Sequence, residues 1–387
     1  MPGVIVPNGP EGGVPIRSWA PDLPAGALRL LQLVASRPWA TERVVAMPDA
    51  HVAEGVAVGT VFATRDVLVP AALGGDLGCG IAAVRLDYPA ASLSRTQLED
   101  LLAALTKRFP SGDEGHRGGG AAVPDALRQA PLSTGVLEHA RERLARRHLG
   151  TLGGGNHFIE LDRDAGGDLW VLVHSGSRGL GGAIGAHHCR AAESLGTKPL
   201  AGLPLDSEPG QAFLSDLQWA LAFAKGNRDR LLEQTVEAIQ DLVGDTLASA
   251  GRLDVVHNFV AAEEHDGKRL WVHRKGAIAA PVGVHAVIPG SMGTASYLVE
   301  GLGEPTSFGS ASHGAGRTMT RREARETIRR GELERAMRRV VFDPRRADAL
   351  VEEAPAVYRD IRAVLESEAD LIRPILRLEP IAVFKGR

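Results

Sequence analysis

Residues 150–161 read GTLGGGNHFIEL, and residues 168–174 read DLWVLVH. In both segments a histidine stands at the polar end of a short apolar run. This pattern is typical of a buried strand that ends at the edge of a sheet. The runs LDVVHNF and LWVHRKG repeat the pattern, so that the four histidines are His157, His174, His257 and His273. Any one of them alone is best read as an ordinary hydrogen-bonded residue. Because strands of one sheet can bring their ends together, four such histidines predict a shared site.

Helical and strand-like segments alternate around this pattern, which predicts an α/β (α+β) fold. We expect helices near residues 25–36, 94–109 with Ser94 as the cap, 133–148, and 210–250 with a possible break near Gly226. The chain from Thr320 on is expected to be helical until a closing strand, LEPIAVFKG, and residues 110–125 to form a mobile surface loop. Neither an internal repeat nor a convincing linker divides the sequence, so residues 1–387 are expected to form a single domain.

Composition excludes several classes of protein. Lys and Arg number 44 against 47 Asp and Glu, so the overall charge indicates neither a nucleic-acid nor a membrane partner. Two cysteines cannot make a disulfide framework, and no apolar run is long enough for a signal peptide or a membrane span. The sequence therefore predicts a cytoplasmic protein that does not enter the membrane.

A second glycine-rich segment, ALGGDLGCGIAAVRLD, places Asp76 and Cys79 three residues apart before a strand. A carboxylate and a thiolate held together in this way suit a transition metal. The alternative is that Cys79 is a small buried hydrophobic residue, the usual role of a free cysteine. The flanking glycines favour the metal, although ligand type alone does not choose between zinc and other ions.

The segment GSASHGAGR surrounds His313 with small residues. Two other segments, VHSGSRGLGG and VIPGSMGTAS, can turn backbone N–H groups toward an anion, and Arg178 could add a guanidinium for phosphate oxygens. The phosphate-binding P-loop motif, the lysine motif of ordinary nucleotidyl-transferring ligases and the serine nucleophile elbow are all missing, and Ile184 stands where a dinucleotide fingerprint needs glycine. If a nucleotide is activated here, an uncluttered histidine such as His313 is a competent nucleophile.

The segments MPDAH, GGDLGCG, GTLGGGNHFIE, VLVHSGSRGLG, VVHN, WVHRKGA, IPGSMGTASY, SHGAGR and a terminal KG resemble, in this order, the RtcB family of RNA ligases. The resemblance runs from about Met47 to Gly386. It implies one domain with central β-sheets surrounded by helices. It also implies a ligase that uses GTP and two Mn²⁺ ions to join an RNA 2′,3′-cyclic-phosphate or 3′-phosphate end to a 5′-hydroxyl end, in tRNA splicing or RNA repair.

The resemblance also assigns roles to residues. His313 would carry GMP as a phosphoramidate, and the catalytic positions would be His313, Cys79 and Asp49. The implied metal ligands are Asp76, Cys79, His157, His174 and His257, with Cys79 bridging the two ions. The implied nucleotide contacts are Asn156, Glu160, Ser291, Ser296, Arg317 and Lys385.

Some points differ from the family's pattern or stay open. MPDAHVAEGVAVG is looser than the usual version, and SAS stands before His313 where cysteine is common. Ten arginines against five acidic residues between Arg321 and Arg346 fit either an RNA-binding surface or a solvated helix with pairs such as Glu334 with Arg338.

The competing functions are a metal-dependent phosphohydrolase acting on nucleic-acid ends and a non-catalytic RNA-binding protein. The physiological RNA, the oligomeric state and the need for an accessory activator protein are left open.

Overall fold

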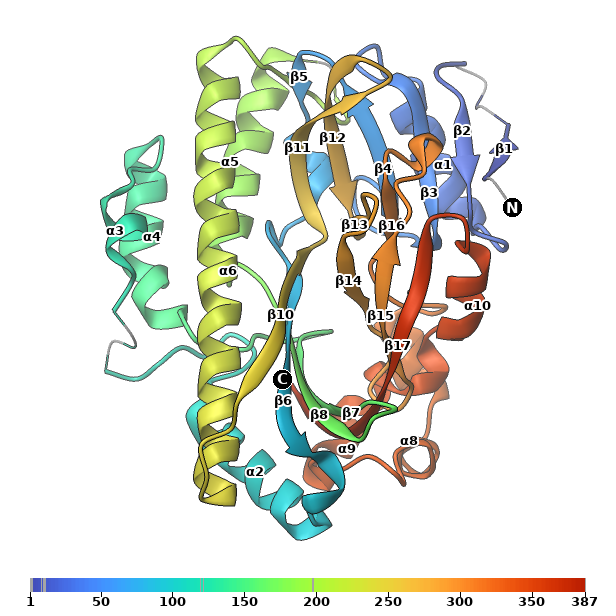
Figure 1. Cartoon of the computed structure of the whole chain (residues 1–387). Coiled ribbons are helices and arrows are strands. Elements are labelled where there is room, and N and C mark those ends of the chain that lie inside the picture. The colour runs from blue at the N-terminus through green and yellow to red at the C-terminus, as the bar shows by residue number, and fades with distance from the viewer. Residues whose placement is uncertain are drawn as a thin grey trace.

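Two β-sheets carry most of the strands, and the chain passes from one sheet to the other at His257 (Figure 1). The computed structural model describes residues 3–7, 9, 12–118, 120, 122–196 and 198–386. The six-stranded sheet contains, in spatial order, β1 (Val4–Val6), β2 (Ile16–Ser18), β3 (Thr41–His51), β4 (Val58–Thr64), β12 (Lys268–Lys275) and β11 (Asn258–His265). The seven-stranded sheet contains β10 (Ser249–Val256), β6 (Gly80–Pro89), β8 (Asp168–Ser175), β7 (Phe158–Arg163), β17 (Ile372–Lys385), β15 (Ser296–Gly301) and β14 (His285–Ile288).

Two smaller sheets complete the β structure: β13 (Ala277–Ala279) pairs with β16 (Ser310–Ser312), and β5 (Val67–Leu68) pairs with β9 (Leu203–Pro204). Strand pairing is antiparallel except between β2 and β3. The long strand β17 lies between β7 and β15, so it carries the end of the chain from one side of the seven-stranded sheet to the site described below.

Helices cover the outer faces of the sheets (Figure 1). The long helix α6 (Glu208–Val243) packs on β6 and β8 and lies beside α5 (Leu180–Leu195), while α2 (Arg95–Arg108) contacts α6 and β17. On the other side, α1 (Ala25–Ala35) and α10 (Ile361–Ser367) pack on β3. The remaining α-helices are α3 (Asp125–Gln129), α4 (Gly135–His148), α7 (Arg321–Thr327), α8 (Arg330–Ala336) and α9 (Ala347–Leu350). Short 3₁₀ turns span Pro70–Leu73, Ala90–Ser92, Pro305–Ser307, Pro344–Arg346, Val351–Glu353 and Pro355–Val357.

The arrangement confirms the predicted α/β fold with central sheets and surrounding helices. The cap of α2 is also confirmed: the Ser94 side chain accepts a hydrogen bond from the backbone N–H of Gln97, and the Gln97 side chain accepts one from Ser94. Buried leucines of α2 and α6 pack against apolar residues of β6, β7 and β8, which forms the largest core cluster on that side. Among the helices that the structure describes, none is long and apolar enough to cross a bilayer.

Three expectations about helices were wrong. The helix expected over residues 210–250 runs unbroken through Gly226 and ends before Gly244, whose φ of 72° is the left-handed conformation that glycine favours. Residues 249–256 form β10, which pairs with β6 and confirms the strand predicted in the LDVVHNF run. The glycine-rich segment after Ser175 leads directly into α5, which was not predicted as a helix. Within residues 110–125 the described part forms neither helix nor strand before Asp125, and its mobility stays a prediction.

Candidate active site

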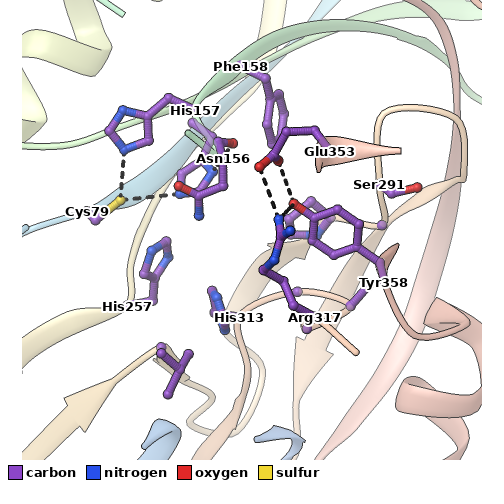
Figure 2. Close-up of a pocket in the computed structure, with 18 of the residues that line it drawn as sticks. Cys79, Asn156, His157, Phe158, His257, Ser291, His313, Arg317, Glu353 and Tyr358 are labelled. Carbon is purple, nitrogen blue, oxygen red and sulfur yellow. Dashed lines mark hydrogen bonds and ion pairs between the residues drawn. The ribbon is translucent and has the colours of Figure 1, made fainter. Parts of the chain in front are cut away.

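A pocket lies where the two sheets meet, lined by strand ends and glycine-rich loops (Figure 2). It collects residues from far apart in the sequence, from His51 to Lys385. The predicted site residues that line it are Asp76, Cys79, Asn156, His157, Glu160, His174, His257, Ser291, Ser296, His313, Arg317 and Lys385. Asp49 is completely buried directly behind the pocket wall, in contact with His313.

Cys79, His157 and His174 form one compact cluster of buried side chains. The Cys79 Sγ lies 3.4 Å from His157 Nε2 and 3.3 Å from His174 Nε2. The other ring nitrogen of each histidine faces a backbone carbonyl oxygen: His157 Nδ1 lies 3.0 Å from Leu152 O, and His174 Nδ1 lies 3.2 Å from Asn156 O. Because a carbonyl oxygen only accepts, each ring donates from Nδ1 and presents the lone pair of Nε2 to the sulfur. This is the tautomer that a metal-binding histidine needs.

Asp76 stands beside this cluster. Its Oδ1 accepts hydrogen bonds from the backbone N–H and the hydroxyl of Ser177, both at 2.9 Å, and its Oδ2 lies 3.2 Å from His157 Nε2. Burial alone would raise the pKa of Asp76, but a protonated His157 and the bonds from Ser177 lower it below its usual range. When His157 is neutral, its Nε2 lone pair faces the Asp76 carboxylate. A carboxylate oxygen and an imidazole lone pair that face each other both need a positive partner, so these residues fit a cation. Residue 176 must be glycine here, since a Cβ would collide with the Asp76 carboxylate.

His257 completes the set at the junction of β10 and β11. Its backbone N–H donates to Cys79 O at 2.9 Å, and its ring centre lies 5.2 Å from that of His174 and 4.8 Å from that of His313. Burial lowers the pKa of both His174 and His257, and burial together with the charge of Asp76 raises the pKa of the Cys79 thiol. Neutral imidazoles and a thiol that loses its proton on coordination are the donor set of a transition-metal site.

His313 follows β16 and lies next to His257 (Figure 2). Its Nδ1 lies 2.6 Å from Asp49 Oδ2, although the ring hydrogen is not well aligned with that oxygen. The backbone N–H of His313 also donates to Asp49 Oδ2, at 3.3 Å. Because Asp49 lies against Nδ1, Nε2 is the ring nitrogen of His313 that is available to react. Arg359 fixes the Asp49 segment by donating to Asp49 O and Ala50 O.

The predicted nucleotide contacts lie on the side of the pocket formed by β7, β15 and β17. Ser296 Oγ donates to Glu160 Oε1 at 3.2 Å, and burial raises the pKa of Glu160 to about 8 against the opposing effects of Ser296 and Lys385. Ser291 shares a hydrogen bond of 2.9 Å with the hydroxyl of Thr294 in a turn. Burial and the charge of Glu160 also raise the pKa of the neighbouring Asp162, so this buried pair of carboxyls holds a proton more readily than an exposed pair does.

Glu353 was missed by the sequence analysis, and it pairs with both predicted cations of the pocket. Arg317 Nη1 donates to Glu353 Oε1 at 3.1 Å and the Tyr358 hydroxyl donates to Oε2 at 2.6 Å (Figure 2). Lys385 Nζ also donates to Oε2, at 3.1 Å. Burial alone would raise the pKa of Glu353, but Lys385, Tyr358 and Arg317 lower it to about 2. Glu353 lies in a run of short turns with no motif, so no signal in the sequence marks it.

Two residues singled out in the sequence lie elsewhere. His273 lies inside β12, completely buried, where its Nε2 accepts the Val69 N–H at 3.1 Å and its ring stacks on Phe62. It is the ordinary hydrogen-bonded core histidine that the alternative interpretation describes. Arg178 does not line the pocket: it donates to Thr151 Oγ1 and Gly112 O, and so ties together the loops behind His157.

Fold and site together define a mixed α/β protein in which a buried thiol–imidazole centre, suited to a transition metal, lies beside His313 in a pocket lined by several charged side chains. The chain belongs to the RtcB family: the family described as tRNA-splicing ligase RtcB matches residues 30–386. The RNA-splicing ligase RtcB of Escherichia coli K12 is 35% identical, over 96% of this chain and 97% of its own length. The RNA-splicing ligase RtcB of Mycobacterium tuberculosis is 32% identical over 91% of this chain and 99% of its own length. The tRNA-splicing ligase RtcB of Thermococcus kodakarensis is 29% identical over 91% and 89%.

Proposed function

We propose that this protein is a GTP- and Mn²⁺-dependent RNA ligase that joins 3′-phosphate or 2′,3′-cyclic-phosphate ends to 5′-hydroxyl ends through a guanylyl group on His313. The observation that carries the proposal is His313 itself, which contacts Asp49 through Nδ1 and lies beside the Cys79, His157 and His174 cluster. The family's printed descriptions, all of them ligases acting in RNA or tRNA splicing, supply the substrate class.

A 2′,3′-cyclic-phosphate end would first be hydrolysed: water adds to the phosphorus, the P–O2′ bond breaks, and a 3′-phosphate is left. The joining then follows three transfers. First, His313 Nε2 attacks the α-phosphorus of GTP, a P–N bond forms, and the P–O bond to pyrophosphate breaks. Second, an oxygen of the RNA 3′-phosphate attacks the same phosphorus, the P–N bond breaks, and His313 recovers its lone pair. Third, the 5′-hydroxyl attacks the activated 3′-phosphate, GMP leaves, and the proton of the hydroxyl passes to a base. Asp49 stabilises the positive charge that the ring carries while phosphorus is bound to it.

Two Mn²⁺ ions would be held by Asp76, Cys79, His157, His174 and His257. When bound, they would supply Lewis-acid stabilisation of the phosphate oxygens. The chain's own contribution is to fix the ligand rings, through the carbonyl oxygens of Leu152 and Asn156, and to exclude water by burying the centre.

The nucleotide would occupy the polar side of the pocket, held by Asn156, Glu160, Ser291, Ser296, Arg317 and Lys385. In the structure Glu353 pairs with Arg317 and Lys385. We propose that an incoming GTP takes over part of this pairing, with Glu353 keeping both cations in place until then.

The arginine-rich stretch between Arg321 and Arg346 supports binding of RNA in one part and not in another. Arg321 lines the pocket and is half-exposed, which suits a contact with phosphate near the reacting end. Farther along, Arg322 pairs with Glu326 and Arg330 with Glu334, so part of the stretch is a solvated helix surface. An accessory activator, the choice between splicing and repair, the single domain and the cytoplasmic location stay predictions.

The test is a joining reaction in which the 3′-phosphate of one RNA strand is labelled. With GTP and Mn²⁺, we expect sealing to a 5′-hydroxyl strand and recovery of the label in the new 3′,5′ linkage. A 3′-hydroxyl strand and a 5′-phosphate strand should not be joined. An unlabelled junction, or efficient sealing of the second pair, would show that activation takes place at the other end.

A further inference from the structure

Behind His313, a buried glutamate holds the residue that precedes it. Glu368 follows α10 and is completely buried, and its Oε2 accepts two hydrogen bonds from Ser312, from the backbone N–H and from the hydroxyl, each at 2.9 Å. Ser312 is the last residue of β16 and is also completely buried. The main chain that leads into His313 is therefore held by Glu368 on one residue and by Asp49 on the next.

Glu368 lies in a group of carboxyls that includes Asp49 of β3 and Asp370, which both raise its pKa. One oxygen of each carboxyl is buried without a hydrogen-bond partner: Asp49 Oδ1, Glu368 Oε1 and Asp370 Oδ2. The other Asp370 oxygen accepts from Trp19 Nε1, and the nearby cation, Arg359, donates to backbone oxygens. His51 and His313 are the titratable rings beside Asp49. Burial, opposed by the bonds from Ser312, raises the pKa of Glu368 to about 8.

A neutral Glu368 avoids electrostatic repulsion with Asp49. Two ionised carboxylates buried close together repel each other, and Asp49 must stay next to His313 to balance the charge that the ring acquires. An uncharged acid still accepts both hydrogen bonds from Ser312, but adds no second negative charge behind Asp49.

We propose that Glu368 is a positioning residue that holds Ser312 and thereby fixes the His313 ring against Asp49. The proposal rests on the proposed function, in which His313 is the nucleophile. Displacement of a reacting atom by about 1 Å costs on the order of a hundredfold in rate, so loss of this anchor has a measurable effect.

The experiment compares Glu368→Gln, Glu368→Ala and the control Glu366→Ala, which alters an exposed glutamate on α10, just before Glu368. Glutamine keeps a neutral acceptor for Ser312, and alanine leaves both donors buried without one. Nitrogen NMR of histidine-labelled protein, with His313 assigned through His313→Gln, reports the tautomer of that ring. The rate at which α-labelled GTP labels the protein is measured from about pH 6.5 to 9.5, which brackets the pKa of Glu368.

We expect the wild type, Glu368→Gln and Glu366→Ala to show one fixed Nδ1–H tautomer of His313, and Glu368→Ala to show an averaged ring signal. Glu368→Ala should be labelled at least about tenfold more slowly. Above about pH 8 the wild type should slow as Glu368 ionises, and Glu368→Gln should not share that loss. Glu368→Ala with the wild-type ring signal, or Glu368→Gln with the wild-type loss of rate at high pH, overturns the proposal. The ring signals could behave as expected while neither the wild type nor any variant takes up label. In that case the proposed function fails and the positioning role stands.

Discussion

Cys79 contributes sulfur to the candidate metal centre from a loop whose shape depends on its neighbours. The backbone N–H of Cys79 donates to Asp76 O, and Gly78 has a φ of 75°, a conformation that few other residues adopt. The structure therefore presents the thiol and the Asp76 carboxylate together. The role of each as a metal ligand is a prediction that rests on this geometry.

Replacing Cys79 by alanine should lower the Mn²⁺ content of the purified protein and abolish ligation, because the variant lacks the sulfur that both histidines face. The fold should persist, since a single small side chain contributes little to the core. Metal analysis and circular dichroism check the two statements. Cys189→Ala, at a half-buried position on α5, is the matched control and should keep both metal and activity. Two Mn²⁺ per chain and normal ligation in Cys79→Ala would make Cys79 a packing residue.

Glu353 leads to a prediction about how the stability of the protein depends on pH. Its pKa is lowered from about 4.5 to about 2 in the folded protein, so its ion pairs stabilise the fold fully above about pH 4.5 and are lost as pH falls toward 2. Glu353→Gln should therefore be less stable than the wild type at pH 7, and the difference should shrink by about 1 kcal/mol by pH 3.5. Urea unfolding at both pH values measures it. A difference that is the same at both values would show that the ion pairs do not lower the pKa of Glu353.

Helix α6 is the element that holds the loops of the centre in place. Asn227, buried in its middle, accepts hydrogen bonds from the backbone N–H groups of Gly150 and Thr151 and donates to Gly176 O. The next residue, Arg228, donates to Gly78 O and Ser175 O and pairs with Asp254. One turn of one helix thus fixes the loops that carry Cys79, His157 and His174.

Asn227→Ala should destabilise the protein by about 3 kcal/mol, because the N–H groups of Gly150 and Thr151 would be buried without an acceptor. It should also weaken Mn²⁺ binding, since the loop before His157 loses its anchor. Thermal unfolding and a Mn²⁺ titration measure the two effects. Lys225→Ala, which removes only an exposed pair with Asp229, should change neither. A variant Asn227→Ala with wild-type stability would show that α6 does not organise these loops.

Elements were predictable from sequence where local pattern decided them. The cap of α2 and the strands that present His157 and His174 are local features, and they were found. The strand in LDVVHNF was also found, but α6 ends before the predicted residue 250, because the chain from Ser249 on pairs with β6, more than 150 residues earlier in the sequence. His273 has the same local sequence pattern as the other histidines, but β12 belongs to the other sheet and buries it between Phe62 and Val69. Glu353 and Glu368 act through distant partners, and their own surroundings in the sequence carry no motif.

At the scale of the whole molecule, the site exists because two sheets meet. His257 lies where the chain leaves the seven-stranded sheet for the six-stranded one, and Asp49 comes from the six-stranded sheet while Glu160 and Lys385 come from the other. Of the candidate metal ligands, His174 lies in β8 of the seven-stranded sheet, whereas His313 follows β16 of a two-stranded sheet and contacts Asp49 of the six-stranded one. This arrangement suits a reaction in which one phosphate is bound by residues of more than one sheet.

The most direct test of the account is to incubate the protein with α-labelled GTP and Mn²⁺ and then treat it with acid or alkali. We predict that the wild type retains label that survives alkali and is lost in acid, as a phosphoramidate on His313 should be, and that His313→Ala retains none. His285→Ala, at an exposed position on β14, serves as the control and should be labelled like the wild type. A wild type that takes up no label, or undiminished label in His313→Ala, would contradict the assignment of His313 as the nucleophile.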